Sequence, residues 1–342
     1  MSFFKLLVAS PNAEVKDSDL KDFYPAANGN MAWTTIKPYI QQAEELLIIP
    51  HIGQEFYDLL DGLYNGSGIT NADQQRVFYR LQTALGAYIA YIALPELAMR
   101  LGDAGIRENN NKETTAARQW VYRETLWKAQ LKANKFLDQA LYLMEQKVEE
   151  GDPNFDTFKD SSTYTVSRNF WIHNATQFSR YFNISNSRRT YVNLRPYIEK
   201  VQELEVRALL GEEMYTELQT QINSNNLTDP NDKLLEACRR YIAELTLIES
   251  IGDVNFIQDG SGWVSIENSV MVYEPSAQTD RMSQQMLSKA EANAARFRTA
   301  IERMIYSNIE NYPTFRDSSA NLSTDDDDAQ LPPECVYGAV DL

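Results

Sequence analysis

The residues of this chain that could do chemistry are few, and their spacing matches no common reactive site. The only histidines are His51 and His173, and the only cysteines are Cys238 and Cys335. Neither histidine has a second histidine or a cysteine at the spacing of zinc ligands. Two cysteines are also too few for a disulfide framework. We therefore expect no zinc site and no structural disulfide.

Adjacent carboxylates are the next candidates, because paired acids can hold iron or calcium. A di-iron site in a helix bundle requires Glu-x-x-His motifs, which the sequence lacks. The aspartates at 325–328 lack the spaced ligands and central glycine of a calcium-binding loop. We interpret the pairs as solvated helix faces and the aspartates as a flexible acidic tail. The pairs are Glu44 with Glu45, Glu149 with Glu150, and Glu212 with Glu213.

Sequence signatures of the common enzyme classes are also missing. The chain has no phosphate-binding Gly-x-x-x-x-Gly-Lys-Ser/Thr loop, no Gly-x-Ser-x-Gly nucleophile turn and no dinucleotide-binding Gly-x-Gly-x-x-Gly. We expect no catalytic residue, no bound cofactor and no metal. The chain is interpreted as a protein without enzymatic activity.

The elements that would have to position any site occur twice in the sequence. Residues 36–40 (IKPYI) and 53–57 (GQEFY) return 158 positions later as 194–198 (LRPYI) and 211–215 (GEEMY). A repeat of this length is a folded unit rather than the short period of a solenoid. The sequence therefore predicts a tandem duplication of one domain. Later matches include FKDSS at 158–162 with FRDSS at 315–319.

Apolar residues recur at helical spacing in both copies, so we expect a mainly α fold with about four helices in each copy. The first helix of each copy has Pro38 or Pro196 in its first turn and is ended by Gly53 or Gly211 in a left-handed conformation. The last helix is the longest, from about 114 to 150 and from about 278 to 311. The predicted buried stripe of the first helix is Ile36, Ile40, Ala43 and Leu47, and in the second copy Leu194, Ile198, Val201 and Leu204 or Glu205.

The second copy carries one predicted departure from this pattern. Residues 263–266 and 270–273 alternate as strands around Asn268 and Ser269, which predicts a small β-hairpin insertion. The expected organisation is a first copy at 1–160, an interdomain segment at 161–192, a second copy at 193–319 and an acidic tail at 320–342.

Composition narrows the possible partners. The chain has 342 residues, with 32 basic and 48 acidic side chains and a formal net charge of -16. Proteins that grip nucleic acid normally have the opposite balance, so we expect no tight binding of DNA or RNA. The longest stretch of low charge, 84–95, is shorter than the roughly 20 residues that cross a bilayer. We expect no membrane segment, no secretory signal and a cytosolic product.

The repeated unit resembles a known family. Its order is a hydrophobic residue with Lys/Arg-Pro-Tyr-Ile, an acidic helix, Gly-x-Glu-x-Tyr, a polar loop and a Tyr-Ile-Ala helix. This order is similar to that of the helical head-to-tail connector proteins of tailed bacteriophages, especially phages of Bacteroidetes and the crAss-like phages. Those adaptors are single small domains, whereas this chain has two copies.

The resemblance implies a structural protein of the virion neck. Such a protein forms a homo-oligomeric ring of about twelve subunits and binds the portal protein and the tail or further ring proteins. It continues the DNA channel, with at most weak, non-specific passage of DNA, and it is made in the host cytoplasm. Ring contacts join two different patches, and we hypothesise that the hairpin and the C-terminal tail provide them. The alternative is a monomeric or dimeric helical binding or scaffold module that acts on a host or phage partner. The candidate interface residues are Trp263, Val270, Tyr273, Phe315 and Tyr337.

Overall fold

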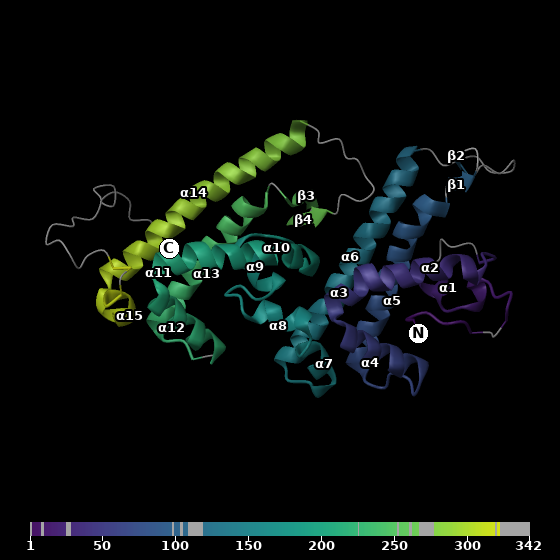
Figure 1. Ribbon diagram of the computed structural model, residues 1–342, viewed down its shortest axis with the longest axis horizontal. Coiled ribbons are helices and arrows are strands. Elements are labelled where there is room, and N and C mark those ends of the chain that lie inside the picture. Colours follow the sequence, from purple (N-terminus) through teal and green to yellow (C-terminus); the bar gives the residue numbers. More distant parts are fainter. Residues whose placement is uncertain are drawn as a thin grey trace. The chain divides into compact units, whose positions relative to one another are not determined.

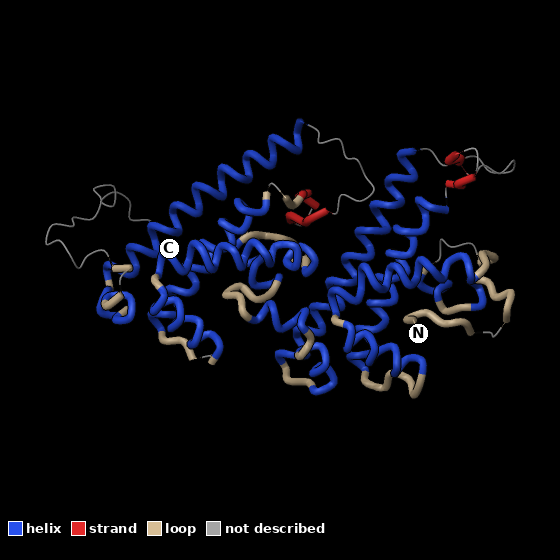
Figure 2. The backbone as a smooth tube through the Cα atoms, viewed as in Figure 1, coloured by secondary structure: helices blue, strands red, loops and turns tan. Residues whose placement is uncertain are grey.

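A computed structural model of the chain is mainly helical (Figures 1 and 2). Two compact units divide it: Met1–Asn193 with Val254–Glu274, and Leu194–Asp253 with Pro275–Leu342. The two units repeat the same order of helices, which confirms the predicted α fold and its duplication. The structure describes residues 2–7, 10–24, 29–97, 99–102, 105–108, 119–224, 226–251, 253–259, 262–266, 277–318 and 320–321.

The first copy is built around two long antiparallel helices, α5 and α6, with shorter helices packed against α5. Its helices are η1 (Val15–Asp17), α1 (Leu20–Phe23), α2 (Trp33–Ala43), η2 (Glu44–Ile48), α3 (Ile49–Ile52), α4 (Gln54–Asn65), α5 (Ala72–Leu97), α6 (Gln119–Glu149), η3 (Pro153–Phe155), α7 (Asp156–Lys159), α8 (Ser162–Arg168) and α9 (Ala175–Tyr181).

The second copy repeats this arrangement with α13 and α14 as its long helical pair. Its helices are α10 (Arg188–Val201), η4 (Gln202–Val206), α11 (Arg207–Leu210), α12 (Glu212–Asn223), α13 (Asp229–Ser250), α14 (Ala277–Ser307), η5 (Ile309–Asn311) and α15 (Pro313–Arg316). A two-stranded hairpin follows the first long helix in each copy: β1 (Met99–Gly102) with β2 (Gly105–Glu108), and β3 (Asn255–Asp259) with β4 (Gly262–Ile266).

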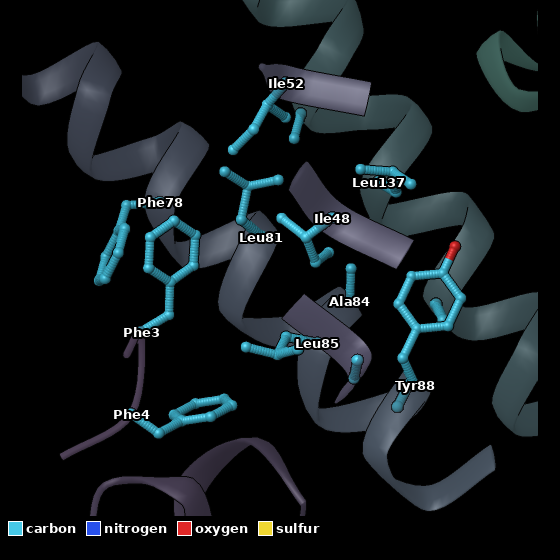
Figure 3. Close-up of a cluster of buried hydrophobic side chains, with 14 of the residues drawn as sticks. Phe3, Phe4, Ile48, Ile52, Phe78, Leu81, Ala84, Leu85, Tyr88 and Leu137 are labelled. Atoms are coloured by element: carbon cyan, nitrogen blue, oxygen red, sulfur yellow. The ribbon is translucent and has the colours of Figure 1, made fainter. Parts of the chain in front are cut away.

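The core of the first unit surrounds α5. Figure 3 shows apolar side chains of α5 between those of the N-terminal segment, η2, α3 and α6. Gly86 allows α1 to approach α5 closely, because a Cβ at this position would lie 2.8 Å from the Phe23 carbonyl oxygen. The labelled core residues are Phe3, Phe4, Ile48, Ile52, Phe78, Leu81, Ala84, Leu85, Tyr88 and Leu137.

Among the described helices, α5 is the one long and apolar enough to span a bilayer, but it is the central helix of the first unit. Within its most apolar window, 78% of the residues are buried by the rest of the chain. Its apolar composition is therefore accounted for by packing inside the bundle.

The first helix of each copy begins earlier than the sequence predicts. Because α2 starts at Trp33 and α10 at Arg188, Pro38 and Pro196 lie inside the helices and not in the first turn. A proline there removes one backbone hydrogen bond, which packing of the neighbouring turns must offset. Gly53 and Gly211 end the helical segments with φ of 82° and 76°, as predicted.

The predicted hairpin is wrong in its pairing and in being an insertion. Gly262–Ile266 pairs with the preceding segment Asn255–Asp259. The segment 270–273, expected as its partner, lies outside the described residues. The first copy has a hairpin at the equivalent place, so the hairpin is shared by both copies.

Candidate interaction surface

The sequence-predicted interface residues do not form a described surface. Phe315 is only 2% exposed and packs edge-on against Tyr306, with ring centroids 5.8 Å apart. It is a core residue, which corrects the prediction that it lies at an interface. Trp263 is placed by its backbone in β4, opposite Gln258. Val270, Tyr273 and Tyr337 lie outside the described residues.

A surface feature that the sequence prediction missed is a π-helical turn at the same position in both copies. The five-residue turns η2 (Glu44–Ile48) and η4 (Gln202–Val206) each interrupt the first helix of a copy. In a π-turn each hydrogen bond spans one residue more than in an α-helix, so the face that points inward shifts by one position. Such turns occur frequently at functional sites in proteins.

The shift is visible in which side chains are buried. Ala43 is followed by Ile48 in the core, and Val201 by Val206, a spacing of five residues instead of four. The six predicted stripe positions that precede the turns are buried, as expected. Leu47 is half-buried and packs against the core. The predictions for Leu204 and Glu205 are wrong, because both side chains are exposed.

Each π-turn exposes one leucine. Leu46 is 59% exposed and Leu204 is 60% exposed. We call η2 with Leu46 the first leucine ridge, and η4 with Leu204 the second leucine ridge. The two leucines are repeat partners, because both positions differ by the same 158 residues as the rest of the motif.

Most of the other matches of the motif have structural reasons. Five of the matched pairs are in the core, close a helix with positive φ, or occupy the first turn of a helix. The leucines, like the prolines Pro38 and Pro196, match at positions that are exposed in both copies. The five pairs with structural reasons are Ile40 with Ile198, Tyr57 with Tyr215, Leu60 with Leu218, Gly53 with Gly211, and Glu55 with Glu213.

Each ridge is followed by a glycine against which a later segment of the same copy packs, just after α7 in the first copy and just after α15 in the second. A Cβ built on Gly53 would lie 2.8 Å from the Ser161 Cβ, and one on Gly211 would lie 2.7 Å from the Ala320 Cβ. This approach leaves no space for a side chain at either glycine. This packing therefore fixes the path of the backbone that follows each ridge.

The repeated serine of the FKDSS and FRDSS segments fixes this contact in the same way twice. The Ser161 hydroxyl donates to the Phe158 carbonyl at 2.6 Å, and the Ser318 hydroxyl donates to the Phe315 carbonyl at 2.8 Å. Both phenylalanines are buried in the core of their own unit. The match between the segments therefore reflects the support beneath each ridge.

The inner side of the first ridge contains a buried acid. Glu44 is 3% exposed, so its interpretation as part of a solvated face is wrong. Its Oε1 accepts hydrogen bonds from the Ser2 hydroxyl at 2.6 Å and from the Phe3 N–H at 2.8 Å. Burial raises the pKa of the Glu44 carboxyl, because the ionised form loses its hydration. Glu44 thus attaches the N-terminal segment to the ridge.

The second ridge has an amide at this position. Gln202 donates from Nε2 to the Tyr215 hydroxyl oxygen at 2.9 Å, and that hydroxyl donates to Glu203 Oε1 at 2.8 Å. The guanidinium of Arg207 lies 4.5 Å from the centroid of the Tyr215 ring and pairs with Glu203 at 2.8 Å. The inner side of each ridge is therefore occupied by hydrogen-bonded groups of the chain itself, and only the outer side is available to a partner.

Carboxylates flank both leucines on the outer side. Glu45 is exposed beside Leu46, and Glu205 is exposed beside Leu204, where Glu203 is half-buried. No lysine or arginine occurs within the five residues of either π-turn. Each ridge therefore presents an apolar tip beside carboxylates, and at the second ridge Arg207, which follows the turn, pairs with Glu203 at 2.8 Å.

A second polar site in the first unit joins α6 to the start of α10. Asp138 accepts from the backbone N–H groups of Arg188 at 2.7 Å and Arg189 at 3.3 Å, and so caps α10. The Arg188 guanidinium is buried, pairs with Glu145 at 2.9 Å and lies 4.8 Å from the Tyr142 ring centroid. Burial raises the pKa of Asp138 to about 6.

This polar site lines an open cavity of about 380 Å³, but its groups bind one another. Arg188 also donates to the Asn186 carbonyl at 2.7 Å and to the Thr176 hydroxyl at 2.8 Å. Its charge is thus already neutralised and its donors are used within the fold. We interpret the cavity as the solvent-open side of the hydrogen-bond network that caps α10. Sequence reasoning missed it because Asp138 and Arg188 are far apart in the chain.

The part of the chain that the structure describes contains no group of three or more histidine, cysteine, aspartate or glutamate side chains placed to hold a metal. The leucine ridges are a surface feature that both copies share.

Comparison with known proteins agrees with the duplication. A family model described as a family of unknown function (DUF6712) matches the chain twice, at residues 48–168 and 206–324. The two matches begin at Ile48 and Val206, which are the last residues of the two π-turns. No curated protein and no solved structure matches the chain. The chain belongs to the DUF6712 family of unknown function and contains two copies of its domain.

Proposed function

We propose that this chain is a structural protein of a phage neck, which forms a head-to-tail connector ring between the portal protein and the tail. The observation that carries the proposal is the exposed leucine at the same rigid turn of both copies. A chain with two such ridges has two attachment points for other proteins of the neck. The resemblance of the repeated motif to phage connectors indicates that the assembly is a ring.

The charge of the chain is compatible with this role. Each phosphate that a protein neutralises strengthens its hold on DNA, because counterions are released. A chain with a formal net charge of -16 has little tendency to hold DNA in place. A connector of this composition would let a genome pass through its channel.

The test is assembly with the candidate partners. The purified chain is measured by mass photometry alone and after incubation with the portal and tail proteins encoded in the same genome. We expect a complex whose mass corresponds to a ring of about twelve copies with the portal protein. A chain that stays monomeric or dimeric with every neck protein, and co-purifies with none of them, would contradict the proposal. That result would favour a small helical binding module.

A further inference from the structure

We infer that the two leucine ridges dock into apolar pockets rimmed by lysine or arginine on a partner protein of the neck. This inference rests on the proposed function and specifies the surface that the chain uses. It adds the chemistry of the partner, which the ridges themselves define.

The first argument is the shape of the ridges. Leu46 and Leu204 stand at the tips of π-turns whose inner sides are filled by the chain's own hydrogen-bonded side chains. The path after each turn is fixed by the tight packing at Gly53 and Gly211. A rigid apolar tip loses little conformational freedom on binding, so more of the energy of burying the leucine is retained as affinity.

The second argument is charge. The exposed carboxylates Glu45 and Glu205 lie next to the leucines in sequence, and neither π-turn contains a basic residue. A pocket with basic side chains at its rim would meet these carboxylates as the leucine enters. Charges placed at the rim of an interface increase the association rate and discriminate against wrong partners.

The same charges disfavour ridge-to-ridge contact between two copies of this chain. Such a contact would place Glu45 or Glu205 of one copy against the same acids of another, and each chain has a formal net charge of -16. Like charges brought together in an interface oppose binding. Ridge-to-ridge contact is therefore disfavoured, and the acidity of this chain favours a partner that is more basic than a second copy.

The test measures binding of the purified portal and tail proteins from the same genome to the full-length chain. The variants are Leu46→Ser, Leu204→Ser and the double substitution, and the affinity of each for the immobilised partner is compared with that of the wild type. Each single substitution is expected to weaken binding about five- to twentyfold, because more than half of a leucine side chain is no longer buried on binding. The double substitution is expected to weaken binding about a hundredfold when both ridges engage.

Val166→Ser is the matched control, since Val166 is 46% exposed on α8 and outside both ridges. It should leave the affinity within about twofold of the wild type. A charge variant, Glu45→Lys with Glu205→Lys, should weaken binding at about 50 mM salt and reduce the salt dependence. Thermal unfolding of each variant checks that replacing the exposed residue has left the fold intact.

The outcomes separate the two proposals. If the wild type binds a neck protein and both leucine variants bind it equally well, the ridges are not the docking surface, although the connector function stands. If the leucine variants lose affinity but the charge variant binds more tightly, the basic rim is wrong. If the wild type binds no neck protein, the connector function and the inference both fail.

Discussion

The glycines that follow the leucine ridges give the sharpest test of the local geometry. Gly53 and Gly211 have φ of 82° and 76° with ψ of 147° and 159°, a backbone region essentially reserved for glycine. Alanine at either position would force its Cβ to within 2.8 Å of Ser161 or 2.7 Å of Ala320. Both the backbone conformation and the contact oppose the substitution.

The expected cost follows from these two effects. A non-glycine residue in this conformation costs on the order of 1–3 kcal/mol. The clash adds to this cost, because the obstructing atoms are Cβ atoms, whose positions are fixed by the backbone and which cannot rotate away. The lower entropy of the unfolded alanine chain returns about 0.4–1 kcal/mol. We therefore expect Gly53→Ala and Gly211→Ala each to lower the free energy of unfolding of their own unit by about 2 kcal/mol.

Gly62→Ala is the matched control within the same region. Gly62 lies inside α4, and a Cβ there would have nothing within 4 Å. Because alanine is favoured over glycine in a helix interior, this substitution should raise stability by about 0.5–1 kcal/mol. Gly53→Ala and Gly211→Ala should therefore lower the free energy of unfolding, whereas Gly62→Ala should raise it.

Urea denaturation followed by far-UV circular dichroism measures these changes. A loss of 2 kcal/mol corresponds to a decrease of about 1 M in the urea midpoint of the affected transition. Since the chain has two units, the curves are fitted with two transitions where the data require them. If alanine at Gly53 and Gly211 leaves the midpoint unchanged or raises it, the positive-φ turns and their close contacts are incorrect.

Three further predictions concern buried polar groups. Glu44→Gln keeps the acceptor used by the Phe3 N–H and should change the free energy of unfolding at pH 7 by less than about 1 kcal/mol. Glu44→Ala leaves that N–H without its partner and should lower the free energy of unfolding by about 2 kcal/mol, as measured by urea denaturation. Equal effects of the two substitutions would contradict the buried hydrogen bonds. The pKa of Asp138 is raised to about 6, so the folded state retains a proton that the unfolded state has released, and stability should increase by about 1 kcal/mol as pH falls from 7 to 5. Comparing the wild type with Asp138→Asn isolates this contribution, and an identical pH dependence of the two proteins would refute it. Cys238 is fully buried and burial raises the pKa of its thiol, so in a Cys335→Ser background it should react with a maleimide only after unfolding; fast labelling of the native protein would show that the core is not closed there.

The duplication and the helical core could be predicted from the sequence because they depend on local patterns. The stripe that begins at Ile36 is buried as far as Ala43, where α-helical spacing holds. Beyond Ala43 the predicted stripe no longer matches the fully buried positions, since a period of 3.6 residues cannot represent an inserted π-turn. The available signal was the apolar residue at both Ile48 and Val206, five positions after the last buried residue of the stripe.

Long-range contacts account for the other differences. The burial of Phe315 against Tyr306 and the capping of α10 by Asp138 depend on residues brought together only by the fold. The hairpin was predicted in the correct region but with the wrong partner strand, because alternation alone does not choose between a preceding and a following strand. The buried Glu44 could not be distinguished from the exposed Glu45 by sequence, because both are glutamates in the same helical segment.

The most direct test of the connector function is electron microscopy of the chain mixed with the portal protein of the same genome. The function predicts annular particles in which this chain forms a closed ring of about twelve subunits on one face of the portal, coaxial with its channel. Images that contain portal rings alone, with this chain present only as free monomers or dimers, would contradict it.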